Sequence, residues 1–235
     1  LLGGGPLPPP VARLYVRQLY SAVAAVHAAG VAHRDIKPEN LLIDAGFNLR
    51  LCDFGFAVVA SRGDDDAEEG DDWEEEDNRR YLSDGEELPP PQQQPQPRPL
   101  LRGEVGTHGY MAPEVLAGLP YCGFAADTWS TAVVAFLMAV GHPPVKAARK
   151  GDWWFDRLSR GDVERFWRTH ERASEVCPSL RAFLTAVLRP AAAERSSAEE
   201  VLQEPGTWLQ GEVAGEEEVV RYMAPLARAA PARAA

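Results

Sequence analysis

The sequence predicts a mainly α-helical α+β fold with one small β-hairpin. Two patterns indicate core helices: apolar residues recur with helical spacing from Val11 to Ala29, and the run TAVVAFLMAVG is apolar on every side. Two short β-prone runs, at residues 41–43 and 49–52, flank Asp44-Ala45-Gly46-Phe47-Asn48, whose Asp, Gly and Asn favour a turn. With 235 residues and 45% apolar content, the chain can bury a sizeable core.

Start and stop signals place these elements in order along the chain. Pro10 is suited to the start of the first helix, and Gly30 can end it in a left-handed conformation. The hairpin follows, and His142-Pro143-Pro144 ends the second core helix, whose apolar run reaches Gly141. Aromatic residues at 153–155 and 166–167 mark two further segments whose rings we expect mostly in the core. We then expect two closing helices, a short helix and a frayed end, at residues 180–188, 198–202, 211–222 and 224–235.

Polar residues suited to phosphate chemistry lie on both sides of the predicted hairpin. Asp35, Lys37 and Asn40 precede it, and Asp53 follows it. A carboxylate can accept the proton of an attacking hydroxyl, a lysine can neutralise charge on a transferred phosphoryl group, and carboxylate and amide oxygens are ligands for Mg²⁺. Because the hairpin folds the chain back, Asn40 and Asp53 should lie close enough to share an ion. Turn capping alone does not account for this combination.

Three ordered motifs resemble the C-terminal lobe of eukaryotic serine/threonine protein kinases. The pattern H-R-D-x-x-x-x-N is matched by His33, Arg34, Asp35 and Asn40. The D-F-G pattern is matched by Asp53, Phe54 and Gly55, and A-P-E by Ala112, Pro113 and Glu114. The I-K-P-E-N sequence around Lys37 resembles serine/threonine kinases rather than tyrosine kinases. The resemblance covers roughly residues 10–61 and 100–208.

The resemblance implies transfer of the γ-phosphoryl group of Mg-ATP to a serine or threonine hydroxyl of a protein substrate. It implies that Asp35 is the catalytic base and that Lys37 stabilises the transferred group. Asn40 and Asp53 are then the Mg²⁺ ligands, and Leu42 forms part of the floor under the adenine.

The resemblance also assigns positioning roles. Thr107 is expected to contact Asp35 and Lys37, and Asp127 to bond backbone amides of the catalytic loop. Glu114 is expected to form a buried ion pair with Arg195, which stands in LRPAAAERSSAEEVL. The D-P pair that the family carries there is replaced by Ala191-Ala192, and the glycine usual after Trp-Ser-x is Ala132. His27, near the end of the first helix, is expected to be an ordinary helix-terminal histidine.

Arg34 resembles an arginine that in many kinases holds a phosphorylated residue of the activation loop. The segment Leu100-Leu101-Arg102-Gly103-Glu104-Val105 contains no serine, threonine or tyrosine. We therefore expect either that Glu104 partly substitutes as a fixed anion or that Arg34 pairs elsewhere.

The nucleotide-clamping N-terminal lobe of this family is not recognisable in the sequence. No G-x-G-x-x-G and no lysine precede Lys37. Either that lobe belongs to sequence outside these 235 residues, which is the more economical explanation, or the gene product lacks it. In the second case the chain would be a non-catalytic pseudokinase or interaction module. A fragment without that lobe should be inactive by itself.

The resulting domain organisation is a partial kinase domain over residues 1–235, interrupted by an insertion and followed by a tail at 209–235. Fifty-six residues separate Gly55 from Ala112, more than the family usually places there. Residues 64–77 hold eleven of the 35 carboxylates, and the remaining 24 balance 24 Lys and Arg. Together with the Pro- and Gln-rich run that follows, this composition predicts disorder over 62–99. The favoured interpretation of the insertion is a tolerated solvated loop; the alternatives are a segment that recruits basic partners and an internal pseudosubstrate-like screen.

Composition excludes several other classes of protein. No basic stripe is present for nucleic-acid binding. The apolar run from Ala132 to Val140 is too short to span a bilayer, and the N-terminus does not resemble a signal peptide. Three cysteines without C-x-x-C spacing indicate a reducing, intracellular environment, cytoplasmic or nuclear, rather than a disulfide scaffold or zinc site. The sequence specifies no oligomeric state.

Overall fold

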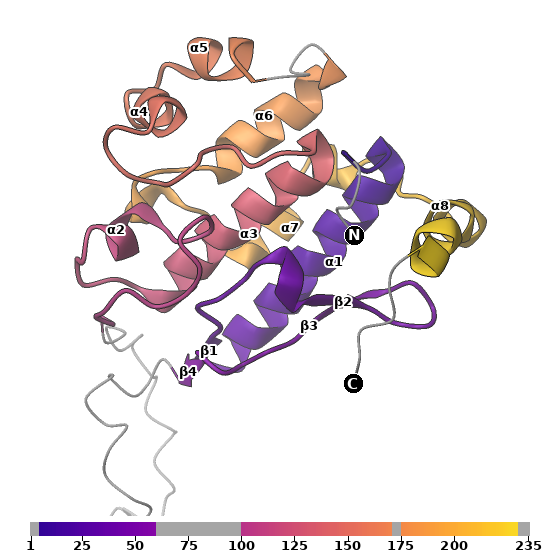
Figure 1. Cartoon of the computed structure of the whole chain (residues 1–235), viewed down its shortest axis with the longest axis horizontal. Helices are drawn as coiled ribbons and strands as arrows, with labels where there is room; N and C mark the ends of the chain where they lie inside the picture. The colour runs from indigo at the N-terminus through magenta and orange to yellow at the C-terminus, as the bar shows by residue number, and fades with distance from the viewer. Residues whose placement is uncertain (1–4, 60–99, 171–174, 230–235) are drawn as a thin grey trace, which may run out of the picture.

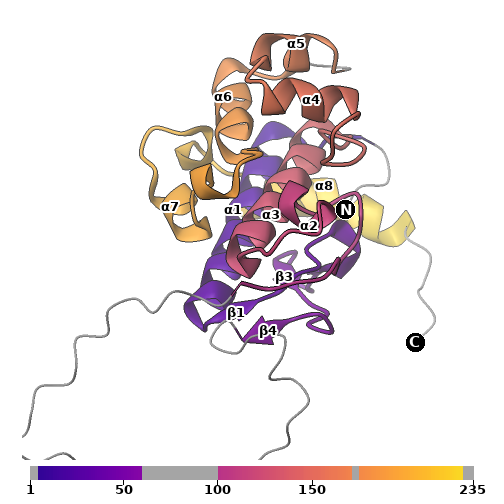
Figure 2. The ribbon, with the colours of Figure 1, turned by 90° about the vertical axis from the view of Figure 1, so that its left-hand side faces the viewer.

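The computed structural model describes residues 5–59, 100–170 and 175–229. The expected disorder over 62–99 therefore concerns residues outside the described part. Figures 1 and 2 show a mainly helical body with two small two-stranded sheets. The helices and strands are α1 Pro9–Ala28, β1 Val31–Ala32, β2 Leu41–Ile43, β3 Leu49–Leu51, β4 Val58–Val59, α2 Pro113–Leu116, α3 Gly123–Val140, α4 Trp153–Ser159, α5 Val163–Arg168, α6 Pro178–Val187, α7 Ala198–Gln203 and α8 Glu216–Ala229. Short 3₁₀ turns occur at Pro38–Asn40, Ala192–Glu194 and Trp208–Gln210.

Helices α1 and α3 form the centre of the core and lie side by side (Figures 1 and 2). Almost every side chain of α3 is buried, including Trp129 and Phe136, as its uniformly apolar sequence predicts. Burying each large apolar side chain contributes about 1.5–3 kcal/mol, so this pair is a major source of stability. Gly30 (φ 76°) follows α1 in the left-handed conformation expected of it, and Gly141 (φ 92°) caps α3 in the same conformation.

The predicted hairpin is present as β2 and β3, with Leu41 opposite Leu51 and Ile43 opposite Leu49. Its turn is closed by Asp44, whose Oδ1 accepts the backbone N–H groups of Gly46 and Asn48 at 2.9 and 2.8 Å. Figure 1 shows the hairpin running beside α1. A second antiparallel pair, β1 with β4, was not predicted, and it joins the two ends of the segment that runs from Val31 to Val59.

The C-terminal elements correct one expectation. The closing helices α6 and α7 lie where they were predicted, and Ser197 caps α7 in a reciprocal arrangement with Glu200. The last helix, α8, begins later than expected and continues through Pro225 to Ala229, over residues predicted to be frayed. Val219 and Met223 are buried against the core, and this packing fixes the helix ahead of the proline.

The aromatic segments form α4 and α5. Phe155, Phe166 and Trp167 are buried as expected, whereas Trp153 is 41% exposed. Among the described helices, α3 alone has the length and apolar composition needed to cross a membrane. Because 83% of it is buried inside the fold, this property is that of a core helix.

Candidate active site

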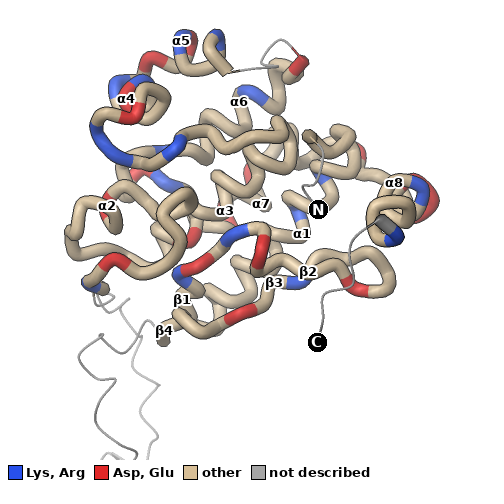
Figure 3. The backbone as a smooth tube through the Cα atoms, in the orientation of Figure 1, with Lys and Arg blue, Asp and Glu red and all other residues tan. Residues whose placement is uncertain are grey.

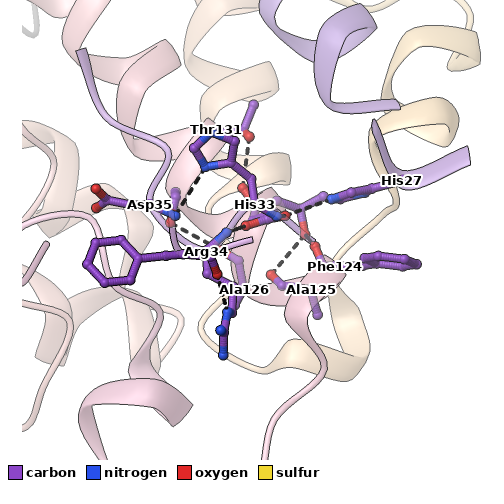
Figure 4. A network of polar contacts seen from close by, with 12 residues as sticks. His27, His33, Arg34, Asp35, Phe124, Ala125, Ala126 and Thr131 are labelled. Carbon is purple, nitrogen blue, oxygen red and sulfur yellow. Dashed lines mark hydrogen bonds and ion pairs between the residues drawn. The ribbon is translucent and has the colours of Figure 1, made fainter. Parts of the chain in front are cut away.

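A buried carboxylate on α3 holds the backbone of the loop at residues 33–40. Asp127 accepts the N–H of His33 on Oδ2 at 2.7 Å and the N–H of Arg34 on Oδ1 at 2.8 Å. His27, at the end of α1, donates from Nε2 to Oδ2 at 3.0 Å. Figure 4 shows His27 reaching this network from the side opposite His33 and Arg34. The predicted bonds from Asp127 to the loop are therefore present.

The loop and the D-F-G segment both contain a non-glycine residue in the left-handed region. Arg34 has φ 67° and Asp53 has φ 64°. Such conformations cost on the order of 1–3 kcal/mol and persist where the surroundings impose them. Here the restraint comes from Asp127 at Arg34 and from His33, whose Nε2 donates to the Cys52 carbonyl at 3.1 Å. Because His33 Nδ1 accepts the Asp35 N–H at 3.3 Å, the network assigns the proton of the neutral ring to Nε2.

Asp35 lies at the centre of a buried polar cluster. Lys37 Nζ lies 2.6 Å from Asp35 Oδ2 and 2.9 Å from Thr107 Oγ1, and Thr107 donates to Asp35 Oδ1 at 2.8 Å. Burial opposes ionisation of Asp35, but the hydrogen bonds from Lys37 and Thr107, the charge of Lys37 and the bond from Asn40 outweigh it. The pKa of Asp35 is consequently lowered from 3.8, and the carboxylate is ionised at neutral pH.

Asn40 and Asp53 lie at the same end of the hairpin. The Cys52 N–H donates to the Asn40 carbonyl at 3.0 Å, which fixes the residue before Asp53 next to Asn40. Asn40 Nδ2 donates to the backbone and side-chain oxygens of Asp35, at 2.8 and 3.2 Å. Its amide oxygen is thereby oriented away from those acceptors. Asp53 is exposed, and its Oδ1 accepts the Gly55 N–H at 3.3 Å. One carboxylate and one amide oxygen are hard donors of the kind Mg²⁺ takes alongside phosphate oxygens and water.

Segment 103–111 packs directly on the catalytic loop. Gly106 (φ 114°) lies so close that a Cβ there would stand 2.5 Å from the Arg34 carbonyl oxygen. Ser130 of α3 donates to the Tyr110 carbonyl at 2.8 Å and anchors the other end of the segment. Thr107 is held between these two contacts, which is why its hydroxyl reaches Asp35.

The ion pair predicted between Glu114 and Arg195 is present and bidentate. Nη1–Oε1 and Nη2–Oε2 are 2.6 and 2.7 Å, and the Arg195 side chain is 1% exposed. Arg195 also donates to three backbone carbonyls, of Ala125, Arg189 and Pro190. Every polar face of the guanidinium is therefore used, and the pair joins α2 to the turn before α7.

Arg34 and Glu104 do not pair with each other in the structure. Glu104 Oε1 lies 2.8 Å from His108 Nε2, and both side chains are largely exposed. Arg34 Nε donates to the Phe56 carbonyl at 2.6 Å. Of the two alternatives for Arg34, the structure thus contains pairing elsewhere rather than pairing with Glu104.

Leu42, which was expected under the adenine, and Phe54 of the D-F-G segment are both exposed. Leu42 is 52% and Phe54 47% exposed, and the Phe54 ring lies 4.8 Å from the ring of His33. The described part of the chain leaves this face uncovered beside Asp53.

His27 is the functional contact that the sequence reasoning missed. Besides its bond to Asp127, its ring stacks on Phe124 with centroids 4.4 Å apart. The one sequence signal was its place in the last turn of the helix that leads directly into His33. A single histidine at a helix end does not reveal a partner 100 positions later.

A buried ionised carboxylate, an adjacent lysine and two oxygen donors that flank a hairpin are groups of the kind used in phosphoryl transfer. The family model of the protein kinase domain matches residues 3–207. The chain belongs to the protein kinase family.

Similar curated proteins are serine/threonine kinases. CBL-interacting serine/threonine-protein kinase 15 of Arabidopsis thaliana is 31% identical over 207 residues, which is 88% of this chain and 39% of that protein. CBL-interacting serine/threonine-protein kinase 24 of the same plant is 33% identical over 71% of this chain and 27% of its own length. Serine/threonine-protein kinase GIN4 of Saccharomyces cerevisiae is 33% identical over 61% of this chain and 10% of its own length. The chain thus spans well under half the length of these relatives.

Proposed function

We propose that this chain is the C-terminal lobe of a serine/threonine protein kinase and that the complete protein transfers the γ-phosphoryl group of ATP to serine or threonine hydroxyls of proteins. The observation that carries the proposal is the cluster of Asp35, Lys37 and Thr107, with contacts of 2.6–2.9 Å around a carboxylate of lowered pKa. An ionised base beside a cation is what in-line transfer to a hydroxyl requires.

Each side chain has a distinct task in this proposal. Asp35 orients the substrate hydroxyl and accepts its proton as transfer proceeds. Lys37 already bonds Asp35 Oδ2 and Thr107, so its ammonium charge is fixed beside the reacting centre. Asn40 and Asp53 supply the oxygen donors for Mg²⁺. Bound Mg-ATP supplies the transferable phosphoryl group and neutralises charge on its phosphates.

The uncovered face beside Asp53 supports the proposal that a second lobe completes the nucleotide site. Leu42, Phe54 and Phe56 are each about half exposed there, at 52%, 47% and 49%. A lobe that clamps ATP would bury these side chains, and phosphoryl transfer would require it.

The three cysteines are unpaired, in keeping with the further proposal that the protein works in a reducing intracellular compartment.

The decisive experiment is a phosphotransfer assay of the complete protein with radiolabelled ATP and a protein substrate mixture. We expect Asp35→Asn to lower the rate about 10²–10⁴-fold, the usual contribution of a general base. Asp53→Ala should abolish Mg²⁺-dependent transfer, whereas Asp162→Asn, at the N-cap of α5, should leave the rate unchanged. A wild-type protein that binds partners but transfers no phosphate would instead be the pseudokinase considered above.

A further inference from the structure

The loop between α3 and α4 carries a cluster of cations far from the catalytic residues. Seven Lys and Arg but four Asp and Glu occur between residues 142 and 170, in a chain whose net charge is −11. Lys146, Arg149 and Lys150 fall within five positions and are all exposed. Figure 3 shows them as a blue stretch of the tube next to α4.

A single carboxylate holds this loop in place. Asp152 Oδ2 accepts the N–H groups of Lys146 and Ala147, and its Oδ1 accepts those of Trp154 and Phe155, at 3.0–3.2 Å. Four amide contacts occupy the carboxylate, so it fastens the loop to α4 instead of pairing with a lysine. Among the described residues, none of the three loop cations forms an ion pair. The loop therefore presents positive charge on a fixed backbone.

A cavity of about 290 Å³ opens beside Lys146, the first of these cations. Its walls include Pro143, Val145, Trp154 and two stacked histidines, His142 and His170, whose ring centroids are 5.1 Å apart. Lys146 lies at its edge, with Nζ 5.7 Å from the centre of the Trp154 ring. The cavity thus offers aromatic and aliphatic walls with a cationic rim. An anionic segment with one large apolar side chain complements this arrangement.

We propose that this surface, formed by the loop cations and the adjacent cavity, binds residues 71–77 of the same chain. Their sequence, Asp-Asp-Trp-Glu-Glu-Glu-Asp, places six carboxylates around a single tryptophan, Trp73. The indole is the anchor for the cavity, and the carboxylates pair with Lys146, Arg149 and Lys150.

Chain length permits this docking within one molecule. Trp73 lies fourteen positions after Val59, and an extended chain of fourteen residues spans roughly 46–50 Å. A domain of about 200 residues has a radius of gyration of only about 17 Å, so a linker of this length can cross it. The proposal concerns a binding surface away from the catalytic cluster and does not depend on catalysis.

The test measures binding of a fluorescein-labelled peptide with the sequence of residues 71–77 to the complete protein by fluorescence anisotropy. A segment variant, in which all seven of these residues are replaced by serine, should bind the peptide. The intact protein should bind it at least tenfold more weakly, because its own segment occupies the surface. A peptide with alanine in place of tryptophan should also bind the segment variant at least tenfold more weakly.

Two triple substitutions in the segment variant test whether the peptide binds at the surface formed by the loop cations and the adjacent cavity. Lys146→Glu, Arg149→Glu and Lys150→Glu together should abolish peptide binding. The matched control Arg189→Glu, Arg221→Glu and Arg228→Glu makes the same change of charge at exposed sites elsewhere and should change the dissociation constant less than twofold. The proposal is overturned if the control weakens binding equally, if the segment variant does not bind the peptide, or if intact protein and segment variant bind it alike. Circular dichroism of each variant establishes that it is folded.

Discussion

His27 and Asp127 meet at 3.0 Å across the interface between α1 and α3, although they lie 100 positions apart in the sequence. The same carboxylate holds the backbone of His33 and Arg34. His27 therefore restrains the group that positions the catalytic loop, without touching the loop side chains that would react.

Replacing His27 by phenylalanine tests this relationship. The ring still stacks on Phe124, but the hydrogen bond to a charged carboxylate is lost, and we expect the free energy of unfolding to fall by about 1.5–3 kcal/mol. The catalytic rate should fall as well, because Asp127 loses one restraint. Urea denaturation and the phosphotransfer assay measure the two effects. His108→Phe, at an exposed ring, is the control and should change the free energy of unfolding by less than about 0.5 kcal/mol.

The pKa of Asp35 can be shifted through Lys37. Lys37→Met removes a hydrogen bond and a positive charge that lower this pKa, so the pKa should rise. Because the pKa of Asp35 is lower in the folded protein than in the unfolded chain, its ionisation increases the free energy of unfolding at pH values above the unfolded pKa. This contribution is lost as the pH falls through the folded pKa. In Lys37→Met, the free energy of unfolding should therefore fall less on acidification. Carboxyl ¹³C NMR titration reports the pKa directly. An Asp35 pKa that is the same in Lys37→Met and in the exposed control Lys150→Met would contradict the assignment.

Removing one partner of the buried ion pair between Glu114 and Arg195 should lower the free energy of unfolding substantially. Arg195→Met leaves Glu114 without its partner, and we expect a loss of about 3–5 kcal/mol in the free energy of unfolding. The double variant Glu114→Leu with Arg195→Met should lose less than the sum of the single variants. Arg50→Met breaks an exposed ion pair with Asp44 and should cost less than about 1 kcal/mol. Similar losses at the two sites would show that burial does not set the difference.

Gly106 should tolerate no side chain, unlike a neighbouring glycine of similar conformation. Both Gly103 (φ 86°) and Gly106 (φ 114°) have positive φ, so alanine at either costs roughly 1–3 kcal/mol in backbone strain. Only at Gly106 would the new Cβ also meet the Arg34 carbonyl, at 2.5 Å. Gly106→Ala should therefore displace Thr107 from Asp35 and lower activity much more than Gly103→Ala. Equal activities of the two variants would contradict this account.

His170 should make the fold sensitive to acid. Burial and the nearby His142 lower its pKa from 6.5 to about 4, so the folded protein resists protonation of a ring that the unfolded chain protonates. Stability is then undiminished above pH 6.5 and falls between pH 6.5 and 4, by on the order of 3 kcal/mol. His170→Leu should flatten this part of the profile in urea denaturation from pH 7.5 to 4.5. An unchanged slope in His170→Leu would contradict this account.

Local signals in the sequence were sufficient for the main elements. Apolar spacing located α1 and α3, glycines marked their ends, and the turn chemistry of Asp44 and Asn48 located the hairpin. These features depend on residues close in sequence, so the sequence alone specifies them. The hairpin then brought Asn40 and Asp53 to one end, as predicted.

Features that depend on distant partners could not be predicted in the same way. The positive φ angles of Arg34 and Asp53 are imposed by hydrogen bonds to residues distant in the sequence. The identities of the two residues alone therefore do not predict these angles. The end of the chain was expected to be frayed from Ala224, yet α8, whose Val219 and Met223 are buried in the core, continues to Ala229. The bond from His27 to Asp127 likewise exists only once α1 and α3 pack together.

The hydrogen bonds that Asp127 accepts from the catalytic loop determine when the site forms during folding and when it is disrupted during unfolding. They close contacts over 94 and 93 positions, so the loop cannot take its working geometry until the second core helix has docked on the first. Slow, late assembly is typical of such long-range contacts. On heating, catalytic competence should vanish in the same cooperative transition as the core, with no inactive but otherwise native species preceding it.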